Sequence, residues 1–279
     1  MVGDFARDTA VEGRDGVYRA TLSSAWEVWG PLGGYVAATA LRAVAAEARL
    51  RRPATFQCAF VSVARFTEVR LEVETLRRSK RAEAFAVRMT QDGTPILHAT
   101  AWVVDTGLAG FVHTDATAPE VPGPDALRSF ADLAENYDDW YPLWRTVDGR
   151  PARWSEEPGP PVWQTWMRLV ATPDLHDPFL DAARTLMWMD LMMWNAATPP
   201  HVPPWPVAYL APNLDLSCLF HAPAPGDEWL LCDAHAPAAA DGLVGCTGRV
   251  WTPSGRLVAS GTSQLFCRPN PLAAPPARS

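Results

Sequence analysis

The chain repeats one order of secondary-structure elements twice, and this repetition constrains its fold more than any other feature. In the first half, residue patterns predict a strand at 16–22, a turn at 29–34, an alanine-rich helix at 35–50 that Pro53 closes, and strands at 56–66, 69–77, 82–90 and 95–104. In the second half they predict a strand at 162–171, a helix at 178–194, and strands at 208–220, 228–235, 244–252 and 257–267. One internal duplication therefore accounts for most of the chain.

This element order predicts the fold class α+β. A helix followed by four antiparallel strands favours a sheet wrapped around that helix, and two such copies can lie side by side as one continuous sheet. We expect residues 1–106 and 161–279 to form the two repeats. Residues 107–160 are rich in Pro, Gly and acidic residues, which is typical of a long connection, with a short helix near 124–135.

Composition limits the class of protein and its location. The 279 residues are 48% hydrophobic, which is enough for a full core, and the formal net charge of −7 argues against a nucleic-acid footprint or a basic membrane-binding face. No apolar run is long enough for a membrane span, and Asp4, Arg7 and Asp8 stand where a signal peptide would be apolar. The five cysteines form no CxxC pair, which favours a reducing, cytoplasmic location.

The common cofactor and nucleophile motifs are missing from the sequence. It contains no GxSxG elbow, no GxGxxG, no GxxxxGK[ST] and no HExxH, so serine hydrolases of the elbow type, Rossmann dehydrogenases, P-loop enzymes and zincins lose support. We therefore expect neither a metal ion nor a cofactor.

Asp190 is the residue that points most directly to chemistry. In the predicted helix its neighbours at i±3 and i±4 are Leu186, Met187, Met193 and Trp194, so the carboxylate shares its face with apolar groups. A buried carboxylate loses hydration, which raises its pKa and suits it to accept a proton from water. The alternative is a helix break here, with Asp190 as a cap or a solvent-facing residue.

Several short motifs resemble the acyl-CoA thioesterase II family of double-hotdog proteins. They are Gly33-Gly34-Tyr35-Val36 at the first helix, Glu228-Trp229-Leu230-Leu231, Gly255-Arg256-Leu257-Val258-Ala259-Ser260 before Arg268, and Trp163-x-x-Trp166-x-Arg168-Leu169 before the helix with Met189-Asp190. The resemblance spans nearly the whole chain outside residues 107–160. It implies two fused hotdog repeats and a hydrolase that acts on acyl-CoA thioesters.

The resemblance also implies three site residues that hold the attacking water. The family has an Asp in the second helix, a Ser or Thr at the start of the next strand and a Gln in the last strand. Asp190 matches the Asp, and Asn213 stands in the place of the hydroxyl residue. An ungapped match puts Ser263 in the Gln position and Gln264 one residue later, so Gln264 needs a bulge or a shifted register. We predict Asp190, Asn213 and Gln264 as catalytic residues, with Asp215 as a reserve base.

A second candidate feature is the glycine turn that opens the first helix. Glycine lets a ligand approach the backbone, and the first N–H groups of a helix carry a partial positive charge. Gly33, Gly34 and Tyr35 are therefore predicted to bind substrate, with the helix end polarising the thioester carbonyl. Alternatively, the glycines only permit a tight entry into the helix.

The predicted function is hydrolysis of acyl-CoA or acyl-pantetheine thioesters in lipid metabolism, by a homo-oligomer. Two alternatives stay open. One is a double-hotdog protein that binds acyl-CoA or lipid without turnover. The other is a hotdog dehydratase that uses His98, His113 or His221, although no histidine follows an Asp by five residues as in the related hydratases.

Overall fold

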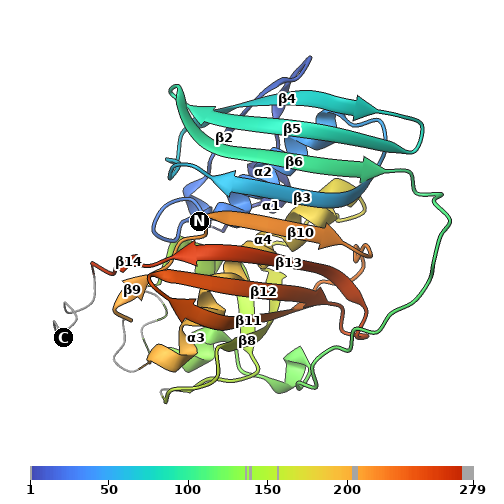
Figure 1. Cartoon of the computed structure of the whole chain (residues 1–279). Helices are drawn as coiled ribbons and strands as arrows, with labels where there is room; N and C mark the ends of the chain where they lie inside the picture. Colours follow the sequence, from blue (N-terminus) through green and yellow to red (C-terminus); the bar gives the residue numbers. More distant parts are fainter. Residues whose placement is uncertain (1, 136, 138–139, 156, 203–206, 272–279) are drawn as a thin grey trace.

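Both halves of the chain contribute to one large antiparallel sheet (Figure 1). A computed structural model describes residues 2–135, 137, 140–155, 157–202 and 207–271. Twelve strands pair in the order β1-β2-β4-β5-β6-β3-β10-β13-β12-β11-β8-β7. Their bounds are β1 Glu12–Arg14, β2 Val17–Thr21, β3 Arg52–Phe60, β4 Glu68–Arg78, β5 Ala82–Gln91, β6 Thr94–Val104, β7 Val147–Pro151, β8 Val162–Leu169, β10 Asp215–Phe220, β11 Leu230–Ala240, β12 Leu243–Trp251 and β13 Leu257–Phe266. The short strands β9 Tyr209–Leu210 and β14 Arg268–Pro269 form a separate pair.

The two halves join along the β3–β10 pair, so the sheet is continuous as predicted. Cys58 pairs with Leu216 and Phe56 with Cys218 at this seam. The paired residues come from opposite halves of the chain, and their side chains are buried. This antiparallel seam fixes the register of one repeat against the other.

Two long helices cover one face of the sheet. Helix α2, Gly33–Glu47, packs on the first repeat and helix α4, Pro178–Ala197, on the second. They run antiparallel against each other, since Gly34 at the start of α2 meets Asp190 near the end of α4, while Arg42 near the end of α2 meets Asp177 at the start of α4. None of the helices described here is both long and apolar enough to cross a membrane.

The first long helix ends earlier than the sequence predicts. Helix α2 stops at Glu47, and Pro53 lies inside strand β3 instead of closing the helix. The buried carboxylate of Glu83 explains the early stop, because it accepts hydrogen bonds from the N–H groups of Arg49 and Leu50. These bonds hold the chain in an extended turn that leads into β3.

Residues 107–160 carry more structure than a plain connection. They include a 3-10 turn at Pro124–Ala126, helix α3 at Phe130–Leu133, a 3-10 turn at Pro142–Arg145 and strand β7, which the sequence analysis misses. The segment also crosses the outer face of the second repeat, where Ala118 and Val121 pack on a cluster of Trp166, Leu231 and Trp251. Strand β7 contains a Gly and a Pro, which weaken a strand signal but are tolerated at a sheet edge.

One buried ion pair anchors helix α4 to the loop after β10. Arg184 is 1% exposed, and its guanidinium donates to the Asp181 carboxylate at 2.7 Å and to the carbonyl oxygens of Ala224 and Asp227. The second carboxylate oxygen of Asp181 accepts the Ala224 N–H at 2.7 Å. Burial makes this pair sensitive to the loss of either member, because the remaining charge has no solvent to compensate it.

We expect Arg184→Ala to lower the free energy of unfolding by about 3–5 kcal/mol, since it leaves the Asp181 carboxylate buried without a cation. Urea unfolding measures this change. Arg19→Ala is the matched control, because the Arg19–Glu68 pair is exposed and such pairs contribute about 1 kcal/mol or less. Equal losses for the two variants would contradict the anchoring role of Arg184.

Candidate active site

Asp190 lies deep between the two helices. The residue is 5% exposed. Of the four neighbours named from the sequence, Leu186, Met187 and Met193 are fully buried and Trp194 is partly buried. The helix does not break here, because α4 continues to Ala197. The carboxylate therefore depends on hydrogen-bond donors from other parts of the fold.

Two such donors reach the carboxylate. The Gly34 N–H donates to Asp190 Oδ2 at 2.6 Å, and Asn213 Nδ2 donates to Oδ1 at 2.6 Å. Asn213 Nδ2 also lies 3.3 Å from the Asp190 carbonyl oxygen. Helix α4, the first turn of α2 and the segment before β10 thus meet at one carboxylate, and the site combines both repeats.

The glycines of the α2 turn make this contact possible. A Cβ atom on Gly33 would lie 2.9 Å from Asp190 Oδ1, and one on Gly34 would lie 2.7 Å from Asp190 Cβ and 2.8 Å from the Met187 backbone. The residue before the helix, Leu32, offers no side-chain cap, and no acid stands in the first turn. Asp190 therefore acts as the cap of α2 from a different helix.

Sequence reasoning treated the glycine turn and Asp190 as separate features and missed their contact. A usable signal was present: a helix that opens on Gly-Gly after Leu32 lacks a Ser, Thr, Asp or Asn cap of its own. Such a helix needs an acceptor from elsewhere in the fold when its first turn is buried.

Burial sets the protonation of Asp190. Desolvation raises the pKa of its carboxyl from 3.8 to about 6, against the smaller opposing effects of the Asn213 and Gly34 hydrogen bonds, which favour the charged form. A carboxyl with a pKa near 6 is mostly ionised at neutral pH and yet basic enough to accept a proton from water.

Asn213 leaves one acceptor free at this site. Its Oδ1 atom is buried and makes no hydrogen bond with the described residues. A buried carbonyl oxygen of this kind favours a hydrogen-bond donor such as water. Asp190 and Asn213 together thus present a base and an acceptor at one place.

Gln264 does not join this site. Its neighbours in β13, Ser263 and Leu265, are buried toward helix α4, so period two turns Gln264 to the outer face of the sheet. Among the described residues, its side chain makes one hydrogen bond, a 3.5 Å contact with the carbonyl oxygen of Leu265. Neither the bulge nor the shifted register that would bring Gln264 inward occurs at this position. The inward residue Ser263 donates through Oγ to the Asp215 carbonyl oxygen at 2.6 Å.

The reserve candidate Asp215 also faces outward. It is exposed, and its carboxylate accepts the Gln264 N–H at 2.8 Å. Strict alternation from 213 to 217 would put Asn213 and Asp215 on one strand face, but β10 begins only at Asp215 and Asn213 makes an isolated bridge with Leu265. The strand alternation therefore does not extend back to Asn213, whose side chain turns inward to Asp190.

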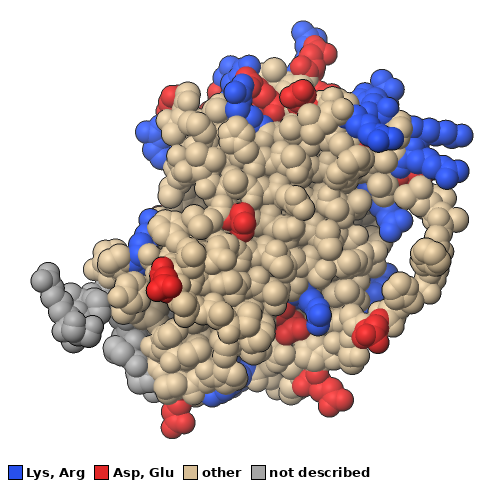
Figure 2. Space-filling view, viewed as in Figure 1, with Lys and Arg blue, Asp and Glu red and all other residues tan. Residues whose placement is uncertain are grey.

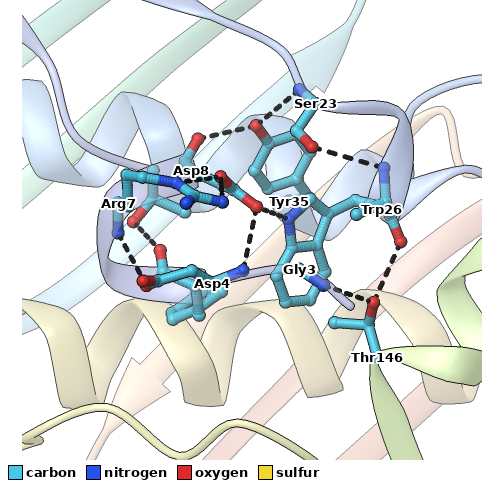
Figure 3. A network of polar contacts seen from close by, with 11 residues as sticks. Gly3, Asp4, Arg7, Asp8, Ser23, Trp26, Tyr35 and Thr146 are labelled. Atoms are coloured by element: carbon cyan, nitrogen blue, oxygen red, sulfur yellow. Dashed lines mark hydrogen bonds and ion pairs between the residues drawn. The ribbon is translucent and has the colours of Figure 1, made fainter. Parts of the chain in front are cut away.

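Tyr35 supports the glycine turn from behind instead of facing a ligand (Figure 3). Its side chain is fully buried; the hydroxyl donates to the Asp8 carbonyl oxygen at 2.6 Å and accepts the Ser23 N–H at 3.1 Å. The ring stacks on Trp26 at 5.4 Å between centroids, and the Trp26 indole donates to the Asp8 carboxylate. The Tyr35 side chain thus fixes the first turn of α2 and is removed from the predicted substrate-binding set.

The three histidines of the dehydratase alternative lie away from Asp190. His98 and His113 are exposed, on β6 and in the connection, and His221 pairs with Ser260 Oγ at 2.8 Å. In the part of the chain that the structure describes, the carboxylate of Asp190 bonds only Gly34 and Asn213.

Among the described residues, no three His, Cys, Asp or Glu side chains are grouped in a way that could hold a metal ion.

Comparison with known families and structures identifies the chain. The family model described as acyl-CoA thioesterase N-terminal domain matches residues 22–104, and the one described as acyl-CoA thioesterase C-terminal domain matches residues 113–266. The chain belongs to the acyl-CoA thioesterase family. It is a thioester hydrolase, and the resemblance drawn from the sequence is confirmed.

Solved structures confirm the double-hotdog fold of this thioesterase. A hot dog fold protein of unknown function from Alicyclobacillus acidocaldarius has a TM-score of 0.83 at 23% identity, over 97% of this chain and 100% of that chain. The acyl-CoA thioesterase II TesB2 from Mycobacterium marinum has a TM-score of 0.79 at 22% identity, over 96% and 99%. The tesB protein from Mycobacterium avium subspecies paratuberculosis has a TM-score of 0.79 at 20% identity, over 96% and 99%.

We expect Gly34→Ala to inactivate the thioesterase and destabilise it. The new methyl group would overlap the Asp190 Cβ and the Met187 backbone, and overpacking of this kind costs about 1–3 kcal/mol. Separation of the helices would also break the bond from the Gly34 N–H to the carboxylate. Thioester hydrolysis and thermal unfolding measure both effects.

Gly110→Ala is the control for this substitution, because a Cβ atom at Gly110 meets open space. Its activity and melting temperature should match those of the unchanged thioesterase. Full activity of Gly34→Ala would contradict the close contact between the two helices.

Proposed function

We propose that this thioesterase hydrolyses acyl-CoA thioesters by direct attack of a water molecule that Asp190 activates. The carboxylate accepts a proton from water, the oxygen bonds to the thioester carbon, and the carbon–sulfur bond breaks as the thiolate leaves and takes up a proton. The observation that carries this proposal is the buried Asp190 carboxylate, with a raised pKa, beside the free acceptor of Asn213. Neither a metal nor a covalent intermediate is required for these steps.

Asn213 is proposed to orient the water. Its Nδ2 group is committed to Asp190, so the water would donate one hydrogen to Asn213 Oδ1 and the other to the carboxylate. This arrangement would point an oxygen lone pair away from both groups and toward the substrate. It needs neither Gln264 nor Asp215, which lie on the other face of the sheet.

The first turn of α2 is proposed to stabilise the oxyanion. The Gly34 N–H bonds Asp190, so the donors left for a developing negative charge are the backbone N–H groups of Gly33 and Tyr35. Both belong to the first turn of the helix, where N–H groups lack intrahelical partners. Tyr35 would thus contribute through its backbone while its side chain holds the turn.

A second candidate function is binding of acyl-CoA without turnover. The displacement of Gln264 from the site favours it, because only two of the three residues that the family resemblance implies come together. Release of free thiol from a panel of acyl-CoA and acyl-pantetheine thioesters decides between the two functions. Sustained thiol release supports hydrolysis, whereas saturable binding with no thiol supports the second candidate.

We infer a role in lipid metabolism in the cytoplasm, a homo-oligomeric state, and a division into repeats at 1–106 and 161–279 around the segment 107–160. Light scattering of the purified protein tests the oligomeric state directly.

Asp190→Asn should lower kcat by about 10²- to 10⁴-fold and leave KM nearly unchanged, because the amide cannot accept the proton of the water. The fold should persist, since the Asn213 amide can rotate and present its free Oδ1 to the new NH₂ group. Asp215→Asn is the control: it removes an exposed carboxylate from the outer face and should leave kcat unchanged. A stable Asp190→Asn variant with the original kcat would refute the role of Asp190.

The raised pKa also predicts opposite pH trends for activity and stability. Hydrolysis should rise with pH through about 6 as Asp190 ionises. The folded pKa exceeds the unfolded one, so this group's contribution to stability is full below about pH 4 and is lost as pH rises through 6. At about 1.4 kcal/mol for each pKa unit, the loss approaches 3 kcal/mol.

The variant Asp190→Asn isolates this effect on stability. The difference in the free energy of unfolding between the variant and the unchanged protein should be larger at pH 8 than at pH 4.5 by about 2 kcal/mol, because pH 4.5 already lies above the unfolded pKa and about 1 kcal/mol of the total is lost there. Chemical denaturation at the two pH values measures the difference. An identical difference between the two proteins at both pH values would show that Asp190 keeps an ordinary pKa.

A further inference from the structure

A concentration of positive charge lies at one end of strands β3, β4 and β5, in a chain whose net charge is negative. The turn between α2 and β3 and the hairpin between β4 and β5 carry seven basic residues: Arg49, Arg51, Arg52, Arg77, Arg78, Lys80 and Arg81. We call this set the basic edge. Figure 2 shows the hairpin part of it as the blue side chains that project at the upper right.

Strand register brings these residues together. Arg52 pairs with Val104 on β6, and Val104 pairs with Ala82 on β5, so the turn and the hairpin are two strands apart. Neighbouring strands lie about 4.8 Å apart, which places the two groups within roughly 10 Å. Glu83 links them further, because it accepts the Arg49 N–H and pairs with Arg78.

Most of the basic edge is not neutralised. Arg51 pairs with Asp177 and Arg78 with Glu83. The other five side chains are exposed and make no ion pair with any residue that the structure describes. At physiological ionic strength charges are screened beyond about 8 Å, so distant acids of the chain do not cancel this local field. The net charge of −7, which argues against a basic membrane-binding face at the level of the sequence, therefore does not describe this edge.

Exposed apolar side chains follow the basic edge a few residues later in the chain. The segment after β6 begins there, since the Asp105 N–H donates to the Arg81 carbonyl oxygen. Within the next seven residues Phe111 and Val112 are 102% and 98% exposed. In Figure 1 the backbone of this segment leaves β6 on the side of the molecule where β4 and β5 connect.

We propose that the basic edge and the Phe111–Val112 pair bind the surface of an anionic lipid bilayer. Basic side chains next to an anionic surface and apolar side chains that enter the interface are the two parts of such binding. A charged protein partner would explain the arginines but would leave the fully exposed Phe111 without a role. The combination favours lipid over an acidic polypeptide.

Docking at this edge leaves the proposed active site open. Asp190 meets the start of α2, whereas Arg49 and Arg52 follow its end. A helix of 15 residues is about 22 Å long, which separates the membrane contact from the site. Lipid binding and hydrolysis can therefore be tested independently.

The test is co-sedimentation of the full chain with vesicles of phosphatidylcholine containing about 30% phosphatidylglycerol, and with vesicles of phosphatidylcholine alone. We expect binding to the anionic vesicles only. The double variant Lys80→Glu/Arg81→Glu should weaken it at least roughly 30-fold. The double variant Phe111→Ser/Val112→Ser should weaken it as well, although it leaves the net charge unchanged.

The double variant Arg14→Glu/Arg19→Glu is the matched control, because it makes the same charge change at exposed positions outside the basic edge. It should bind anionic vesicles as tightly as the unchanged protein. Equal loss of vesicle binding in this control, or no vesicle binding by the unchanged protein, would overturn the proposal. So would vesicle binding that the Phe111→Ser/Val112→Ser change does not weaken, together with equally tight binding of soluble polyglutamate. Hydrolysis of a short, soluble acyl-CoA should be the same for all these variants.

Discussion

The architecture depends on one contact, in which a buried carboxylate on one helix accepts the unpaired N–H of another. Asp190 cannot remain buried without donors, and α2 begins at Gly33 with no acceptor of its own. Each group satisfies the other at 2.6 Å. The glycines keep the helices close enough for this bond, and the seam between β3 and β10 brings Asn213 to the same point. Assembly of the two repeats and formation of the site are therefore one event.

The surroundings of this contact show how the fold tolerates it. Desolvation of Asp190 is unfavourable, and only two hydrogen bonds act against it. The start of α2 is therefore held from the opposite side by the network of Tyr35, Trp26 and Asp8, which ties it to the amino-terminal segment (Figure 3). Thr146 extends the same network by accepting the Gly3 N–H. Rigid support behind the helix start keeps its N–H groups in place against the desolvated carboxylate.

Most of the fold follows from patterns that the sequence carries openly. Strands β4, β5, β6, β12 and β13 lie within a few residues of their predicted bounds, because alternation and turn residues mark them locally. Asp190 was found because a charge on an apolar helix face is locally visible. Gln264 was misplaced because strand period two makes a shift of one residue decisive, and a short motif does not fix the register. The missing cap of α2 is visible in the sequence, but no local pattern names Asp190 as its acceptor or brings Asn213 to the same carboxylate. The basic edge is hidden from any argument based on total charge.

The contact between α2 and α4 has two ends, and different interactions form at each end. At one end α4 gives a carboxylate to the start of α2; at the other end Asp177 caps α4 through the Phe179 N–H and is neutralised by Arg42 and Arg51. Two identical repeats would make these two ends equivalent. Here the second end is occupied by a salt bridge, so the two ends of the helix contact are not equivalent. Within the described residues, the helix pair therefore buries a carboxylate against an uncapped helix start at one end only, and substitutions at Asp177 and at Asp190 should have different consequences.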